Sequence, residues 1–539
     1  MLDRYHERCR LLAELRNILR LIQRVFQRTV IVSKRNSLAA AVVLSITGAM
    51  NLASAVELNP NGLGQVLLYP YFTVNANNQT LISVVNTRDT GKVAKVRFLE
   101  GYDGREVLGF NVYLSPHDVW VAAIFDTSGL SEQPNDGSAP AGLLTPDNSC
   151  TDPGIKVPTS VSLPQLPDGR YYVPFSNSAY SGLSLGATGP EQNDGGPTDL
   201  KRTRTGHIEL IEMASVIGDS LANITHENGV PVNCAALTGA QNNADYTSPT
   251  GGLFGAASIV NASIGTLYGY NADALSGFYT NTGKLFSPSG TTFPNLTSGD
   301  NGNISTGNEV SYVFGNDGSL ITSSWPLNAG GSVDAVSSLF TADQIFNEYE
   351  IDLRNGSVAT EWILTFPTKS YYANPALGSA IQPFTKLFGS DSAHPGTACE
   401  VVSLKKYDRE GKTPHSSGSI GVPPPPPPQP TLCWEAQTTV VLSAASVGLT
   451  SPIFGSPLLA IIDPTDPGTS GMVGVVLSGN GHLLRPSNEG NVFAGLPITG
   501  FLARNFTNKN ATPGVLGNYA GLFRHHISQA CSNPSGACH

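Results

Sequence analysis

The chain has 539 residues, of which 40% are hydrophobic and only 13% are charged, and it contains 57 Gly and 38 Pro. This hydrophobic content excludes a disordered chain, and the lack of a Gly-X-Y period excludes a collagen. Residues 56–539 carry 22 basic and 38 acidic side chains, a net charge of −16. Because so acidic a surface repels phosphate groups, we expect no nucleic-acid partner.

The first 55 residues have the pattern of a targeting segment. Lys34-Arg35 precede an apolar run over 38–52, which ends at 53–55 with the letters A-S-A. This order predicts an N-terminal extension and a Sec-type signal peptide, cleaved between Ala55 and Val56. A retained membrane anchor is the alternative, but it needs about 20 apolar residues. Residues 1–33 are either a basic amphipathic segment for a membrane surface or the result of a start codon placed too far upstream.

The cysteine pattern agrees with export. After cleavage six cysteines remain, namely Cys150, Cys234, Cys399, Cys433, Cys531 and Cys538. An even number behind a signal peptide predicts disulfides in an oxidising compartment, which is the periplasm, the cell surface or the medium. Six cysteines allow 15 pairings, and proximity along the chain favours Cys150–Cys234, Cys399–Cys433 and Cys531–Cys538. No C-x-x-C spacing occurs, so thioredoxin-like, haem and zinc motifs are unsupported.

Residues 56–205 have the pattern of an N-terminal β-domain. Short segments with apolar residues at alternating positions are separated by turn signals such as Asp89-Thr90-Gly91, and the expected strands are 65–74, 80–87, 92–100, 106–115 and 118–126. A period of two is typical of half-buried antiparallel strands. The predicted fold class is mainly β, an antiparallel β-sandwich or open barrel with long loops and few short helices.

Two further regions follow, a β-rich middle region with short helices at 206–395 and a C-terminal β region at 396–539. Strands are expected at 207–213, 310–314, 362–366, 401–406, 438–442 and 473–477. Helix is expected over 251–265 and over 333–349, the latter as one helix or as two divided by a capping box at Thr341 and Gln344. The polyproline loop 421–430 predicts a stiff spacer, and recognition by an SH3-like domain is the alternative.

Seven phrases of the sequence suggest a relationship. They are LNPNGLGQ (58–65), LYPYFT (68–73), SVVNT (83–87), KVRFLEG (95–101), LSPHDVW (114–120), GHIELIEMA (206–214) and TFPTK (365–369). Together they resemble a recurring family of uncharacterised exported β-rich proteins of Gram-negative bacteria, from about residue 57 to the C-terminus. The resemblance implies a bacterial source and a secreted or cell-surface context. It implies no activity, substrate or catalytic residue.

The sequence offers few patterns for catalysis. The letters G-x-S-x-G occur at 182–186 around Ser184, but no helix is expected after them, and 468–472 around Ser470 is only a near match. Both are therefore interpreted as chance matches. His117-Asp118, at a strand entrance, is interpreted as a turn, because adjacent residues of a strand face opposite sides. We assign no catalytic residue.

Metal binding has two candidate segments. His525-His526 and the terminal His539 offer transition-metal ligands, but adjacent His residues in regular structure rarely chelate one ion. Segments 300–303 and 316–318 offer oxygen ligands for calcium, and the same residue types form ordinary turns. We expect no cofactor and no metal, with a structural calcium as the alternative.

These observations favour an exported non-enzymatic surface or matrix protein with a structural, adhesive or binding role. We expect no stable transmembrane segment after processing, and a component of the cell envelope or a self-associating chain. The alternative is an extracellular carbohydrate-active enzyme, but Glu209 and Glu212 are interpreted as structural, because a glycosidase needs carboxylates that converge across a cleft. An outer-membrane barrel is disfavoured by the 38 prolines and the long irregular stretches. A cleft lined by aromatic residues and two carboxylates would favour the enzyme, and a smooth sheet would favour assembly.

Overall fold

The structure, a computed structural model, describes residues 55–538 except 135–137, 157–161, 182–193, 238–243, 282, 302–306, 352–357, 391–394, 414–429, 442–449, 463–469 and 513. Residues Ser54–His539 form one compact unit. The fold is mainly β, with several antiparallel sheets and few short helices, as predicted. The signal segment, most of the polyproline loop, Ser184 and His539 lie outside the described residues.

Two sheets pack face to face in the first half of the chain. The first has the order β1-β16-β2-β10-β4-β5-β8, with β13 paired to β10. Its strands are β1 (Glu57–Leu58), β2 (Val66–Thr73), β4 (Gly91–Glu100), β5 (Glu106–Leu114), β8 (Thr151–Asp152), β10 (Thr205–Val216), β13 (Tyr246–Thr247) and β16 (Asp273–Ser276). The second has the order β15-β14-β3-β6-β7-β9. Its strands are β3 (Gln79–Asn86), β6 (Val119–Asp126), β7 (Ala141–Leu144), β9 (Val173–Pro174), β14 (Leu253–Asn261) and β15 (Thr266–Asn271).

Alternating side chains explain this sandwich. In β3, Ile82 and Val84 are buried while Leu81 is 43% exposed, so one face of the strand turns inward. Inward residues of both sheets meet in one core, where the rings of Phe110 and Trp120 lie 5.6 Å apart. The five strands expected between residues 65 and 126 are confirmed as β2 to β6.

The boundary expected at residue 205 falls at the start of β10. This strand pairs with both β2 and β4, and β14, β15 and β16 extend the two sheets of the sandwich. Strands on both sides of the expected boundary are therefore parts of the same sheets.

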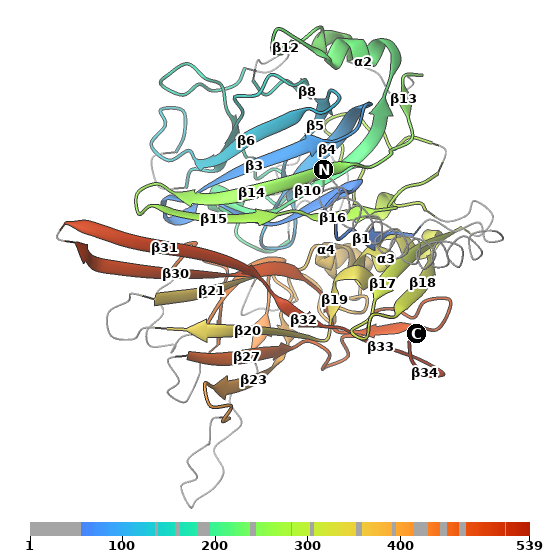
Figure 1. The fold of residues 1–539 in the computed structure, drawn as a ribbon, viewed down its shortest axis with the longest axis vertical. Coiled ribbons are helices and arrows are strands. Elements are labelled where there is room, and N and C mark those ends of the chain that lie inside the picture. Colours follow the sequence, from blue (N-terminus) through green and yellow to red (C-terminus); the bar gives the residue numbers. More distant parts are fainter. Residues whose placement is uncertain are drawn as a thin grey trace, which may run out of the picture. The chain divides into compact units, whose positions relative to one another are not determined.

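The second half of the chain forms two larger sheets (Figure 1). One has the order β26-β25-β21-β30-β31, formed by β21 (Val358–Thr365), β25 (Ala436–Val441), β26 (Leu459–Ile462), β30 (Thr499–Thr512) and β31 (Val515–Arg524). The other has the order β23-β27-β20-β32, formed by β20 (Gln344–Glu350), β23 (Ser403–Asp408), β27 (Ser470–Val476) and β32 (His526–Ser528). The long β30–β31 hairpin runs beside β15 of the sandwich, where the side-chain amide of Asn518 donates to the carbonyl of Ile264 at 2.9 Å (Figure 1).

Short strands and helices complete the described fold. The strands are β11 (His226–Glu227) with β12 (Val230–Pro231), β17 (Asn308–Phe314) with β18 (Leu320–Pro326), β19 (Thr341–Ala342) with β29 (Leu496–Pro497), β22 (Glu400–Val401) with β24 (Thr431–Leu432), and β28 (Val492–Ala494) with β33 (Ala530–Asn533) and β34 (Gly536–Ala537). The α-helices are α2 (Gly218–Ile224), α3 (Gly331–Phe340) and α4 (Lys369–Ala373). Each strand expected after residue 206 coincides with an observed strand.

Two helix predictions were wrong in whole or in part. Segment 251–265 contains the strand β14, whose residues are buried at every second position, so the pattern has a period of two. In 333–349 only the first half is helical, and Gln344 begins β20. Thr341 does not start a second helix, because its hydroxyl donates to the carbonyl of Ser337 at 2.8 Å and so closes α3.

Three disulfides join the six cysteines in the pairing that chain proximity favours, Cys150–Cys234, Cys399–Cys433 and Cys531–Cys538. The second lies beside the paired strands β22 and β24, at the two ends of the segment that contains the polyproline loop. Within the described part of the chain, no helix has the length and the apolar character to cross a membrane. The disulfides fit an oxidising compartment.

Candidate functional site

A polar pocket, called here the charged pocket, lies where the turn between β4 and β5 meets α4. Its volume is about 250 Å³. The turn and its flanking strands contribute Arg97, Asp103, Arg105 and Glu106. The opposite wall contains Thr292, Asn295, Ser370, Tyr371 and Asn374, with Leu377 and Phe388 as apolar neighbours. Two guanidinium groups and two carboxyl groups therefore surround one small cavity.

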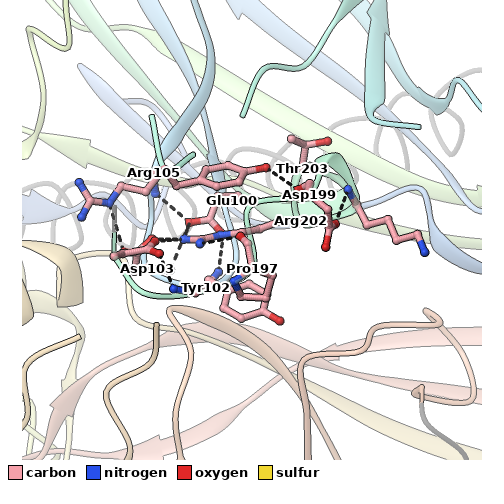
Figure 2. A network of polar contacts seen from close by, with 12 residues as sticks. Glu100, Tyr102, Asp103, Arg105, Pro197, Asp199, Arg202 and Thr203 are labelled. Atoms are coloured by element: carbon pink, nitrogen blue, oxygen red, sulfur yellow. Dashed lines mark hydrogen bonds and ion pairs between the residues drawn. The ribbon is translucent and has the colours of Figure 1, made fainter. Parts of the chain in front are cut away.

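Arg202 binds carboxyl groups at the turn between β4 and β5 (Figure 2). It lies in the short helix Leu200–Arg204, its side chain is 1% exposed, and its Nε donates to Glu100 Oε2 at 2.8 Å. Its Nη2 contacts Asp103 Oδ1 and Asp194 Oδ2, both at 2.5 Å. The guanidinium also lies 4.2 Å from the ring centre of Tyr180. Charge-assisted hydrogen bonds and ring contacts thus fix this residue from several directions.

The carboxyl groups around Arg202 outnumber their cationic partners. Three carboxyl groups face two guanidinium groups, because Arg105 Nε contacts Asp103 Oδ2 at 3.1 Å. Burial alone would raise the pKa of Glu100, but its bonds with Arg202 hold that pKa at about 2. Burial, with Glu100 and Asp194 nearby, raises the pKa of Asp103 well above its usual range. The raised pKa of Asp103 agrees with this excess of carboxyl groups, because a buried site disfavours uncompensated negative charge.

Arg97 connects the pocket to the interior of the sheet. Its Nε contacts Glu106 Oε2 at 2.7 Å, and its Nη1 contacts Glu209 Oε2 at 2.5 Å. Burial raises the pKa of Glu209, whose second carboxylate oxygen has no hydrogen-bond partner in the structure. Glu106 is the more accessible acid, with 16% of its side chain exposed.

Behind Ser370 of the pocket wall lies the buried carboxyl group of Glu435. Ser370 Oγ donates to Glu435 Oε1 at 3.2 Å, and His207 Nε2 lies 3.9 Å from the same oxygen. Burial and the neighbouring acids Glu209 and Glu100 raise the pKa of Glu435 well above its usual range. Burial and Arg97 lower the pKa of His207 to about 3, so its ring is neutral.

This arrangement suits binding better than catalysis. The two carboxyl groups that line the pocket are both held by guanidinium groups, Asp103 by Arg202 and Glu106 by Arg97. A general base needs a carboxylate that is free to take a proton, and a glycosidase needs two that face the scissile bond. Ser370 contacts a carboxyl group and not an imidazole, which differs from a Ser-His-Asp triad.

A second feature is the face of the β3-β6-β14 sheet that points away from the core, called here the outer face. The Cα register places its residues side by side, with Ser83 opposite both Ala256 and Val121, and Leu81 opposite both Ser258 and Ala123. None of its side chains is charged; they are Gln79, Leu81, Ser83, Val85, Val119, Val121, Ala123, Phe125, Leu144, Phe254, Ala256, Ser258, Val260, Leu267, Gly269 and Asn271.

The outer face is largely apolar, and several of its side chains are exposed to solvent. Leu267 is 58% exposed, Val119 46% and Leu81 43%. Small residues between them leave a shallow hollow of about 330 Å³, lined by side chains such as Leu81, Val121 and Ala256. Solvated faces of antiparallel sheets are usually polar, so an uncharged and largely apolar one is unusual.

A third cavity, of about 560 Å³, lies between β16 and the β30–β31 hairpin. Its one buried acid, Asp273, accepts hydrogen bonds from Thr499 and from Arg524, whose side chain is 77% exposed. The carboxylate of Asp273 therefore already has two hydrogen-bond partners within the protein.

The residues singled out from sequence mostly have structural contacts. His117 lies in a turn with a φ of 58°, and its ring contacts the exposed Asp89 at 2.9 Å. Asp118 accepts from the backbone N–H of Ser115 at 3.0 Å, so the turn prediction is confirmed. Glu212 contacts Lys92 Nζ at 2.6 Å, with both side chains fully buried. The structure therefore separates Glu209 and Glu212 into two independent ion pairs.

The remaining catalytic and metal candidates are similarly engaged. Ser470 begins β27 and pairs with Glu350, so it does not lie on a strand-to-helix elbow. Both ring nitrogens of His525 have partners, Nδ1 with Asn347 at 2.8 Å and Nε2 with the carbonyl of Ile363 at 2.7 Å. Asn301 ties Gly277 to Val310, and the rest of the 300–303 segment lies largely outside the described residues.

No cluster of three or more His, Cys, Asp or Glu side chains with the geometry of a metal site occurs among the described residues. Structural calcium stays a prediction that the structure does not test. The cleavage prediction at Ala55 and Val56 is likewise untested, but both residues are described and buried. Val56 forms a parallel bridge with β17, donating to the carbonyl of Val310 at 2.8 Å and accepting from Tyr312 at 3.0 Å.

Comparisons with protein-family models, with curated proteins and with solved structures find no match to this chain. The family resemblance therefore stays a prediction. Sequence reasoning missed the charged pocket. One signal was present, because β4 places Lys95 and Arg97 among apolar residues on a strand that is buried throughout. The Lys-Arg-Thr-Arg segment at 201–204 carried no such signal, although Arg202 is buried.

Proposed function

We propose that this protein is an exported, non-enzymatic surface or matrix protein, and that its copies associate through the outer face. The observation that carries this proposal is an apolar sheet face with no charged side chain, in a chain whose residues 56–539 have a net charge of −16. Like charges oppose contact between two copies elsewhere on such a surface. At the outer face, two copies meet without bringing charged side chains together.

The size of the outer face agrees with a specific but modest interface. Neighbouring strands lie about 4.8 Å apart and residues advance about 3.4 Å along a strand, so five strands and six residues cover on the order of 500 Å². Two such faces together bury about 1,000 Å², near the lower limit for a specific protein interface. The hollow between Leu81, Val121 and Ala256 offers a place for side chains of the facing copy.

Export is supported by the basic and apolar segments before residue 55 and by the three disulfides, which fit an oxidising compartment. Fractionation of the producing cell tests this part. We expect the chain in the periplasm, at the cell surface or in the medium, shortened at its N-terminus. Recovery of the full-length chain from the cytoplasm would contradict it.

Association is tested by placing a charge in the hollow. Ala256→Lys puts an ammonium group between the facing sheets, whereas Val230→Lys changes a residue of β12 that is 51% exposed and lies off the outer face. We expect the molar mass of the wild type and of V230K, measured by light scattering, to rise with concentration, and that of A256K to stay at one chain. A wild type that remains a single chain at all concentrations, or an A256K variant that associates equally, would refute the proposal.

The alternative of a carbohydrate-active enzyme has one observation in its favour, a pocket with two carboxyl groups and a tyrosine. The ion pairs of both acids weigh against it. Release of reducing ends from polysaccharides by the purified protein, lost in Glu106→Gln, would favour the enzyme over the proposal.

A further inference from the structure

The charged pocket offers donors and acceptors side by side. Arg97 and Arg105 line it with guanidinium groups, and Glu106 lines it with a carboxyl group. Ser370 donates its hydrogen to Glu435, so its oxygen lone pairs remain available to accept from a ligand. Asn374 adds an amide on the opposite wall.

The charges of this pocket are already balanced within the protein. Glu106 is paired with Arg97, and Arg105 with Asp103. A ligand with a net charge would leave one of these groups without a counter-ion in a partly buried site, which is costly. A hydroxyl group both donates and accepts, so it fits between a carboxylate and a guanidinium without disturbing either charge.

The volume of the pocket and the apolar part of its wall further restrict the kind of ligand that fits. The volume of about 250 Å³ is below the roughly 300–1,000 Å³ of pockets for drug-sized molecules, so the ligand is small. The ring of Tyr371, with Leu377 and Phe388, supplies an apolar surface beside the polar groups. A molecule with hydroxyl groups at its rim and C–H groups on its faces matches both surfaces.

The polar groups are also held in place before any ligand arrives. Arg97 is bound by Glu209 at 2.5 Å, and its side chain is 7% exposed. Arg202 holds Asp103, whose neighbour Gly104 has a φ of +74°. A Cβ on Gly104 would come within 2.5 Å of Glu435 Oε2. Such preorganisation reduces the entropic cost of binding.

We propose that the charged pocket binds one neutral, hydroxyl-rich ring, a single sugar residue, without cleaving it. The charged pocket is separate from the outer face, so the proposal of sugar binding does not depend on self-association. In a surface protein it would attach the chain to a polysaccharide through one of its sugar units.

The experiment measures binding of free sugars to the purified, disulfide-bonded protein by calorimetry. Neutral hexoses and N-acetylhexosamines are the probes, with glucuronate as an anionic comparator and glycine as a zwitterionic one. We expect at least one neutral sugar to bind and both comparators to bind more weakly. Failure of every neutral sugar to bind at concentrations up to its solubility would overturn the proposal, as would tighter binding of glucuronate or glycine.

Three variants locate the site. Glu106→Gln removes a charged acceptor, and we expect affinity for the sugar to fall about tenfold or more. Asn374→Ala changes a residue of the opposite wall that has no ion pair in the structure, and it covers the case in which E106Q fails to fold. Asp168→Asn, in an exposed pair away from the pocket, is the control and should bind like the wild type. Wild-type affinity in both folded pocket variants, or cleavage of a disaccharide by the wild type, would overturn the proposal.

Discussion

Replacing Arg202 by Met tests whether the buried charge cluster holds the β4–β5 turn in place. The variant keeps a long side chain but leaves Glu100, Asp103 and Asp194 without their shared guanidinium. Removing one partner of a buried ion pair costs about 3–5 kcal/mol. The fall in the pKa of Glu100 from 4.5 to about 2 means that its ionisation contributes about 3 kcal/mol to folding at neutral pH, a net value after the opposing effect of burial.

The effect of pH follows from the direction of that shift. The pKa of Glu100 is lower in the folded chain than in the unfolded one, so its contribution to stability is complete above pH 4.5 and is lost as the pH falls through about 2. In R202M the guanidinium is gone and burial raises the pKa of Glu100, so protonation at low pH relieves the variant. The difference in stability between the two proteins is therefore largest at neutral pH and shrinks in acid.

Urea unfolding with intact disulfides, followed by tryptophan fluorescence at pH 7 and at about pH 3, measures this difference. Arg170→Met is the matched control, because Arg170 forms an exposed pair with Asp168 and its loss should leave the unfolding midpoint unchanged. A wild-type midpoint for R202M at pH 7 would refute the reasoning. So would a loss of stability that is equally large at both pH values.

Three further predictions concern stability and processing. Burial raises the pKa of Glu361 to about 7, so the free energy of unfolding of the wild type should decline by about 3 kcal/mol as the pH rises from 4.5 through 7. Glu361→Gln should remove this decline in urea titrations, and identical pH profiles for the two proteins would contradict the prediction. Cys399→Ser combined with Cys433→Ser should lower the free energy of unfolding by about 3–4 kcal/mol, because the bridge joins residues with a sequence separation of 34. Peptide mapping of the wild type without reduction should recover the two cysteines linked, and free thiols at both positions would exclude the bridge. N-terminal sequencing of the exported chain should begin at Val56, and a chain beginning at Met1 would contradict the signal peptide.

The strands could be predicted from sequence because their signal is local. Alternation in Lys92–Glu100 and in Glu106–Ser115 repeats every two residues, and the same residues form β4 and β5. Short apolar runs are ambiguous by comparison. In 251–265 small residues such as Ala256 and Ala257 suit a helix, and pairing with the neighbouring strands β3 and β15 decides for a strand. The disulfide pairs also followed from proximity along the chain.

The charged pocket could not be predicted in this way. Its parts come from Arg97, Ser370 and Asn374, which are brought together only by the packing of the two halves of the chain. The buried state of Arg202 depends on Glu100, which lies 102 residues earlier, and neither residue carries a local sign of its partner. The uncharged outer face is an intermediate case, because each strand shows the alternation but only the register reveals that all outward positions are uncharged.

The hydrophobic cores have a consequence for how the chain folds. Val56 and Cys538 belong to the same core cluster, and Tyr71 of β2 lies with its ring centre 6.5 Å from that of Phe501 in β30. Neither core is complete until the last residues are available, and such long-range contacts make folding slow. A chain emerging from the ribosome or through a membrane must therefore be protected from aggregation until its final strands arrive. A chain that ends before β30 is expected to be degraded by proteases and not to persist as a smaller folded protein.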